Sequence, residues 1–145
     1  PTVTISADCL DTEFGRSALP ALGETLLKYS NGGSVAHFGS TGLGLDIHHT
    51  ILMDGFYGGI TRDEPIHTIG DAAVNAKIYY INHEGGRNLT NIVTWHEVLA
   101  FTVLGDPALT IPTSNPTPIP RFVFQVVNSF SSTSSITTIL PSAGA

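Results

Sequence analysis

The side chain with the most distinctive chemistry in this sequence is a thiol. Cys9 is the single cysteine among 145 residues, so no disulfide can form within the chain. It follows the β-branched run Thr2–Ala7, which predicts a strand, and precedes a loop and a predicted helix. Open α/β sheets hold ligands and reacting groups at the carboxyl ends of their parallel strands. A thiol there is either a nucleophile, with the N–H groups of the turn aimed at an oxyanion, or a small buried side chain.

A catalytic thiol also needs a base, and histidine is the usual one. The sequence holds six histidines, all after Cys9 and none followed by glycine: His37, His48, His49, His67, His83 and His96. We interpret His37, in the middle of a predicted strand, as a buried structural residue. His48 and His49 end the loop Thr41–His49, where they either face a substrate or begin a solvated helix. The last three are typical of ordinary helix surfaces.

Composition excludes several other classes of protein. The chain is 41% hydrophobic and 12% charged, which is typical of a folded domain and not of a disordered one. Its net charge of −6 argues against a nucleic-acid partner, because such proteins bind phosphates through Lys and Arg. No apolar run approaches the roughly 18 residues that span a bilayer. The sequence therefore predicts a globular domain that neither binds nucleic acid nor crosses a membrane.

The elements that must position these residues follow an α/β pattern. Period-two and period-3.6 spacing of apolar residues alternates along the first three quarters of the chain. We predict strands near residues 2–7, 34–39 and 108–111, and helices near residues 17–29, 46–56, 65–81 and 89–104. Strand, helix and strand joined by short turns form the unit of a parallel sheet. The predicted fold is three-layer α/β with a mostly parallel sheet.

Composition changes after residue 111. Four prolines fall within residues 112–120, which predicts an extended linker. Residues 121–127 predict a further strand, and the stretch that follows is rich in Ser and Thr. The division is thus a domain over residues 1–111, a linker over 112–120 and the start of a second β unit over 121–145.

Four segments, taken in order, indicate a family. They are Cys9–Phe14 (CLDTEF), Leu22–Glu24 (LGE), Gly33–Thr41 (GSVAHFGST) and Phe101–Leu109 (FTVLGDPAL). Residues 1–111 resemble the C-terminal half of the gingipain-type cysteine peptidase domain, which has a caspase-like α/β fold. The resemblance implies that this chain is a partial domain. It also implies that residues 121–145 begin an immunoglobulin-like module.

The resemblance implies a role for particular residues. Cys9 would be the nucleophile, with its own N–H as one oxyanion donor, and Glu24 would be structural. The segment after the second strand would wall the substrate pocket, with Ser40, Thr41, Asp46, His48 and His49 as the substrate-binding residues. The family's base is a His in a His-Gly pair upstream of the cysteine, yet residues 1–8 hold no histidine. We therefore expect the base on an upstream segment that also completes the sheet, so that residues 1–145 alone are inactive and not a stable monomer.

These expectations define two candidate functions. The first is the C-terminal part of a secreted or cell-surface cysteine endopeptidase that acts on a peptide or protein substrate. The second is a non-catalytic extracellular structural or adhesive module that keeps the fold, which would fit the proline linker and the Ser/Thr tail. No cofactor is required by the first, although family members often bind calcium. Asp46, Asp54, Asp63 and Glu64 are either calcium ligands or scattered surface carboxylates.

Overall fold

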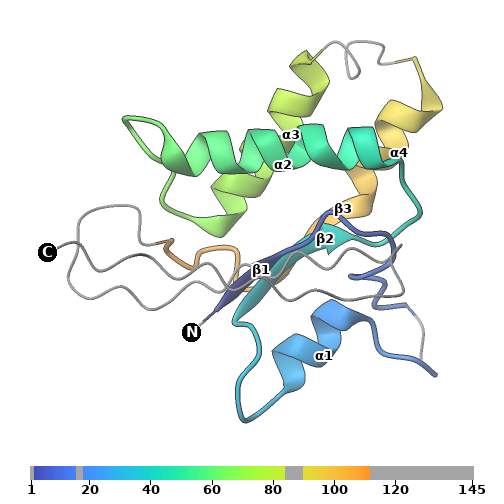
Figure 1. Cartoon of the computed structure of the whole chain (residues 1–145), viewed down its shortest axis with the longest axis vertical. Helices are drawn as coiled ribbons and strands as arrows, with labels where there is room; N and C mark the ends of the chain where they lie inside the picture. The colour runs from blue at the N-terminus through green and yellow to red at the C-terminus, as the bar shows by residue number, and fades with distance from the viewer. Residues whose placement is uncertain (1, 16–17, 84–89, 112–145) are drawn as a thin grey trace, which may run out of the picture.

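The computed structural model describes residues 2–15, 18–83 and 90–111. The elements in chain order are β1 (Val3–Ile5), α1 (Leu22–Lys28), β2 (Ala36–Ser40), α2 (Asp46–Thr61), α3 (Ile69–Asn82), α4 (Ile92–Ala100) and β3 (Phe101–Gly105). Helix α1 covers one face of the sheet, and α2, α3 and α4 lie on the other (Figure 1). The three-layer α/β fold predicted from the sequence is confirmed. The predicted linker 112–120 and β unit 121–145 fall outside the described residues.

The described sheet has three strands in the order β1-β2-β3. Strand β1 pairs with β2 in parallel, with Val3 opposite Ala36. Strand β2 pairs with β3 in the antiparallel direction, with Ser40 opposite Phe101. The described part of the sheet is therefore mixed. Within it β1 lies at an edge with β2 as its only neighbour, and the sequence analysis expects an upstream segment to complete the sheet.

The third strand is not where the sequence predicts it. The helix expected over residues 89–104 ends at Ala100, and the chain enters β3 at the next residue, Phe101. An apolar run of this length fits both a helix and a buried strand, so spacing alone cannot find the boundary. The strand predicted over residues 108–111 is wrong. Gly105 turns the chain with φ of 108°, and in the described residues 106–111 only Thr110 forms a single bridge, to Thr68.

The core lies between the sheet and helices α2 and α3. Every residue of β2 is buried, and the Phe38 ring stacks on Phe56 of α2 with centroids 5.2 Å apart. Phe38 also packs against Phe101 of β3 at 5.4 Å. Helix α3 approaches α2 at Gly55, where a Cβ atom would come within 2.6 Å of Tyr79 Cβ. Burial of this aromatic cluster fixes the faces of β2, because neighbouring residues of a strand point to opposite sides.

The predicted helices are present with shifted ends. Helix α2 continues five residues past the predicted end, to Thr61. Helix α3 begins at Ile69, after an N-cap in which the Thr68 hydroxyl accepts a hydrogen bond from the Asp71 N–H. Helix α1 begins only at Leu22. Among the described residues, no helix has the length and apolar character needed to cross a membrane.

Candidate active site

Cys9 lies in the turn that leaves β1, next to the segment that leaves β2. Its Sγ is 3.4 Å from the Gly44 amide nitrogen and 3.6 Å from the Gly44 carbonyl oxygen. The turn is anchored to the same segment by a hydrogen bond from the Leu10 N–H to the Gly42 carbonyl. Leu10 has a φ of 62°, an unusual left-handed conformation for a side chain of its size. The thiol is partly exposed, at the carboxyl ends of two parallel strands.

The amide that the sequence analysis assigns to an oxyanion is engaged in this structure. The Cys9 N–H donates a hydrogen bond to Asp8 Oδ1 at 2.8 Å. The amide that points at the sulfur is the Gly44 N–H, which was not predicted. A thiolate at Cys9 can accept a hydrogen bond from this N–H, whereas a neutral thiol can donate to the Gly44 carbonyl. The only sequence signal for the contact is the pair of glycines at 42 and 44, which lets the backbone come close.

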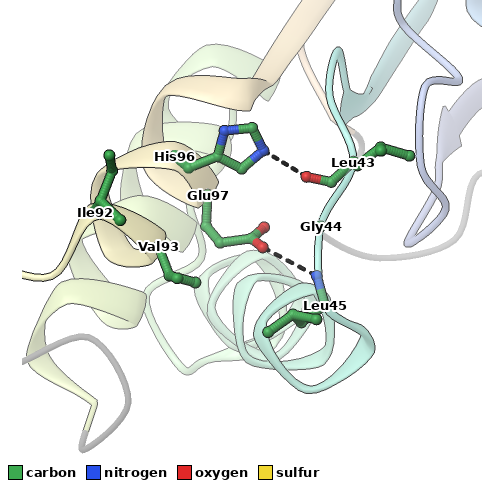
Figure 2. A pocket seen from close by; sticks show the side chains of 7 residues that line it. All are labelled: Leu43, Gly44, Leu45, Ile92, Val93, His96 and Glu97. Carbon is green, nitrogen blue, oxygen red and sulfur yellow. Dashed lines mark hydrogen bonds between the residues drawn. The ribbon is translucent and has the colours of Figure 1, made fainter.

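Helix α4 holds the segment that touches Cys9. The His96 Nε2 hydrogen-bonds to the Leu43 carbonyl oxygen, and the Glu97 Oε1 accepts from the Leu45 N–H at 3.0 Å. Figure 2 shows these two contacts on either side of Gly44. Between the segment and the helix lies a pocket of about 380 Å³, lined by Leu43, Gly44, Leu45, Ile92, Val93, His96 and Glu97. One glycine therefore forms both a wall of the pocket and the contact with the thiol.

The carboxylate of Glu97 also faces a buried histidine. His49 Nε2 lies 3.3 Å from Glu97 Oε2, and the two side chains are 2% and 1% exposed. The other ring nitrogen, Nδ1, is 2.9 Å from the carbonyl oxygen of Ala7, which can only accept, so Nδ1 carries a proton. The second nitrogen would repel an ionised carboxylate unless it is protonated too. The two groups are not aligned as a hydrogen bond, and we describe them as a buried ion pair.

The pKa shifts of the two groups agree with an ion pair. Burial alone would lower the pKa of His49, but the Glu97 carboxylate and the Ala7 carbonyl outweigh it and raise that pKa above its ordinary value. Burial alone would raise the pKa of Glu97, and contacts with His49 and the Leu45 N–H lower it below its ordinary value. Each group thus holds the other in its charged form.

Ser40 and Thr41 make contacts within the fold. Ser40 is fully buried, and its hydroxyl donates to the Gly42 carbonyl at 3.0 Å. The Thr41 hydroxyl is partly buried and donates to the Ala100 carbonyl at 2.9 Å. The sequence analysis assigns both side chains to substrate binding. In this structure they shape the segment after β2, and Ser40 has no surface with which to touch a substrate.

The three other predicted substrate-binding residues lie on the first turn of α2. Asp46 is exposed, whereas His48 is half-buried, with Nδ1 2.9 Å from the Tyr80 hydroxyl. His49 is buried in the ion pair, so its side chain cannot contact a substrate directly. The expectation that His49 faces a pocket is therefore corrected: it lies beneath the segment that lines the pocket. Its burial follows from helical spacing, because His49 shares a face of α2 with Leu52 and Phe56 of the core.

A second buried pair stands on the other face of the sheet. His37 Nε2 is 3.0 Å from Asp11 Oδ2, and Asp11 Oδ1 accepts a hydrogen bond from the Ser40 N–H at 2.9 Å. A Cβ atom on Gly39 would come within 2.4 Å of Asp11 Oδ1, so only glycine fits there. The buried, structural role predicted for His37 is confirmed by its zero exposure. The sequence analysis did not single out Asp11 as its partner.

Four of the histidines have identified partners in the fold. His37, His48, His49 and His96 contact, respectively, Asp11, Tyr80, Ala7 with Glu97, and Leu43. The suggested calcium ligands Asp46, Asp54, Asp63 and Glu64 are all exposed. In residues 2–15, 18–83 and 90–111, no group of three or more His, Cys, Asp or Glu side chains is placed to hold a metal ion.

Comparison with solved structures identifies the class of fold. The complex of the pro- and mature domains of RgpB from Porphyromonas gingivalis matches with a TM-score of 0.64 and 19% identity over 75% of this chain. The arginine-specific cysteine proteinase gingipain R (RgpB) matches with a TM-score of 0.57 and 18% identity over 77%. A structure described as a protease matches with a TM-score of 0.64 and 17% identity over 85%. The chain has the α/β fold of the gingipains.

A match to a family model identifies the family. The family model described as peptidase family C25 matches residues 1–112. The chain belongs to peptidase family C25. It spans only 26%, 26% and 33% of the three similar structures, in the order given above. No curated protein matches the sequence significantly.

Proposed function

We propose that the native protein is a cysteine endopeptidase and that Cys9 is its nucleophile. The Cys9 thiolate attacks the carbonyl carbon of a peptide bond, and the oxygen of the tetrahedral intermediate accepts hydrogen bonds from backbone amides. A histidine that has taken the thiol proton returns it to the leaving amine, which leaves a thioester on Cys9. Water then hydrolyses the thioester, releases the acid and restores the thiol. None of these steps requires a metal or another cofactor.

The observation that carries the proposal is the match to peptidase family C25 over residues 1–112, with Cys9 at the carboxyl end of β1. The neighbouring segment offers the Gly44 N–H to the sulfur and borders a pocket of about 380 Å³. Gly44 therefore offers an N–H that can stabilise a thiolate and also lines a cavity, which Cys9 itself does not line. A stabilised thiolate with a neighbouring cavity supports covalent catalysis on a peptide.

We further propose that the base lies on a segment upstream of residue 1. His37, His48, His49 and His96 each contact another group, and in the described chain β1 has a strand on one side only. A strand added at this free edge would satisfy its backbone groups and end beside Cys9. The resemblance to gingipain-type peptidases supports a histidine at the end of that strand. It also supports secretion or attachment to the cell surface.

The proposal is tested with the native-length protein and two shortened or altered forms. Hydrolysis of a casein substrate is measured for the wild type, for Cys9→Ala and for residues 1–145 alone. We expect activity in the wild type only, with Cys9→Ala lower by about 10⁴-fold or more because the covalent route is lost. Activity that survives in Cys9→Ala contradicts the proposal. A wild-type protein with no activity would instead favour the non-catalytic surface module.

A further inference from the structure

We propose that Glu97 of α4 is a positioning residue for the Cys9 thiol, acting through both backbone segments that flank it. The inference rests on the proposed function, because it assigns Glu97 a part in the reaction of Cys9. Glu97 does not itself contact the sulfur. Each of its two carboxylate oxygens instead faces a group that leads, by one further contact, to the site of the nucleophile.

The first connection runs through the segment after β2. Glu97 Oε1 accepts from the Leu45 N–H at 3.0 Å, and the neighbouring Gly44 N–H lies 3.4 Å from Cys9 Sγ. His96 holds the other side of the same glycine at the Leu43 carbonyl. Adjacent residues of one helix therefore fix the peptide groups on both sides of Gly44 (Figure 2). A shift of α4 must move the Gly44 amide relative to the sulfur.

The second connection runs through the buried ion pair. Glu97 Oε2 lies 3.3 Å from His49 Nε2, and His49 Nδ1 donates to the Ala7 carbonyl at 2.9 Å. Ala7 is two residues before Cys9, in the turn that follows β1. One carboxylate thus connects to the turn that carries the nucleophile and to the segment opposite it. The exposure of Glu97 is 1%, so its charge is not screened by water and its position is set by packing.

The close fit around Gly44 explains why a short displacement matters. A Cβ atom at Gly44 would come within 1.9 Å of His49 Nε2 and 2.8 Å of Glu97 Oε1. The Gly44 backbone is therefore packed directly on the ion pair. Its N–H also contacts the sulfur of Cys9. Misplacement of a reacting group by about 1 Å can lower a catalytic rate by about 100-fold. The ion pair acts on catalysis through this geometry.

The test measures the reactivity of Cys9 in the native-length protein. The rate of alkylation by iodoacetamide at pH 7 is followed by mass spectrometry of the peptide that contains Cys9. The variants are Glu97→Ala, which removes both contacts, and Glu97→Gln, whose amide oxygen can still accept from the Leu45 N–H. The matched control is Asn75→Ala, which removes a hydrogen bond of 2.7 Å to the Gly55 carbonyl between α2 and α3. Circular dichroism and thermal melting report the fold of each variant.

We expect Glu97→Ala to slow alkylation of Cys9 by about threefold or more, because the thiolate loses the well-placed Gly44 N–H. The same variant should lower kcat by about tenfold or more with little change in KM. Glu97→Gln, which keeps the contact with the Leu45 N–H but not the ion pair, should recover part of both losses, whereas Asn75→Ala should match the wild type in both. Should Glu97→Ala fail to fold, Glu97→Asp replaces it, because its shorter side chain cannot reach both partners.

Three results overturn the inference. They are unchanged alkylation in the folded variant, equal losses in Glu97→Ala and Asn75→Ala, and faster alkylation, which would show that the segment only covers the thiol. Failure of the proposed function is separate. It would appear as a wild-type protein that cleaves no peptide, while the dependence of Cys9 alkylation on Glu97 is still measured.

Discussion

Two histidine–carboxylate pairs are buried on opposite faces of the sheet, and they differ in what they hold. Asp11 and His37 lie under α1 and form a hydrogen bond of 3.0 Å. His49 and Glu97 lie between α2 and α4, 3.3 Å apart and without hydrogen-bond alignment. The first pair joins the turn after β1 to β2. The second joins two helices, and through them the two segments that meet at Cys9.

The difference indicates that one pair stabilises the fold and the other positions the groups around Cys9. Both oxygens of Asp11 are taken by groups of β2, so this pair fixes the end of a buried strand. Glu97 instead shares its oxygens between the Leu45 N–H and an imidazole, which leaves the pair dependent on the place of α4. We therefore expect the Asp11 pair to dominate stability. The Glu97 pair should dominate the reactivity of the thiol.

Removal of Asp11 should have the largest effect on stability. Asp11→Ala leaves a buried His37 and the Ser40 N–H without their partner, and each buried polar group left unsatisfied costs about 1–3 kcal/mol. Asp46→Ala, at an exposed position, is the control and should change the free energy of unfolding by less than about 0.5 kcal/mol. Urea denaturation measures both. A loss below about 1 kcal/mol for Asp11→Ala would remove the distinction drawn between the pairs.

A methyl group at Gly44 should have the next largest effect. Its Cβ would come within 1.9 Å of His49 Nε2, so Gly44→Ala forces the segment away from the ion pair. Overpacking of this kind costs about 1–3 kcal/mol. The urea midpoint gives the loss, and alkylation of Cys9 should slow in the same variant. If Gly44→Ala keeps the stability and the Cys9 reactivity of the wild type, the segment is not packed tightly against the ion pair.

The ion pair should make stability depend on pH. The folded pKa of His49 is raised above 6.5, so its contribution is complete below pH 6.5 and is lost as pH rises through that raised pKa. The folded pKa of Glu97 is lowered below 4.5, so its contribution is complete above pH 4.5 and is lost as pH falls through that lowered pKa. The pair therefore stabilises the fold most between pH 4.5 and 6.5.

The measurement for this window is the free energy of unfolding of the wild type and of Glu97→Gln across pH. The difference between them should be largest near the middle of the window and should shrink toward alkaline pH. We expect a smaller effect than that of Gly44→Ala, because Glu97→Gln preserves the size of the side chain and its contact with the Leu45 N–H. A difference that is constant from acid to alkaline pH would mean that His49 and Glu97 do not form an ion pair.

The smallest predicted effect has the opposite sign. Gly58 lies on the exposed face of α2, and a Cβ atom there would meet nothing within 4 Å. Gly58→Ala should raise stability by about 0.5–1 kcal/mol, because alanine loses less backbone entropy than glycine in a helix. Gly55→Ala is the contrast, since its Cβ would come within 2.6 Å of Tyr79 Cβ. Thermal melting distinguishes them, and stabilisation by both substitutions would contradict the close packing of α2 on α3.

The order of strands and helices in the first half of the molecule could be predicted because local signals agree there. The run at Thr2–Ala7 and the apolar run before Ser40 each have one clear spacing, and the glycines at 32 and 33 mark the turn that follows α1. They place Cys9 at the end of a strand without any knowledge of distant contacts. The start of β3 could not be found in this way, because the residues on both sides of Phe101 are apolar and suit either structure.

Helix α4 shows why much of the site was missed. Ile92 and Leu99 set its apolar spacing, yet they are 82% and 73% exposed. The side chains that the helix buries include Thr94 and Glu97, which sequence patterns assign to solvent. The partners of Glu97 are His49 on α2 and Leu45 just before α2, which lie 48 and 52 residues away along the chain. Such contacts depend on tertiary packing, which no spacing within α4 encodes.

The central claim, that Cys9 is the nucleophile of a C25-family peptidase, is tested most directly by covalent trapping. The native-length protein is treated with a peptidyl acyloxymethyl ketone, and the modified residue is found by peptide mapping while residual activity is measured. We predict a thioether on Cys9 sulfur, at most one per molecule, that rises in proportion to the loss of activity. Complete inhibition with Cys9 unmodified, or an adduct on another residue that tracks the loss, would contradict the account.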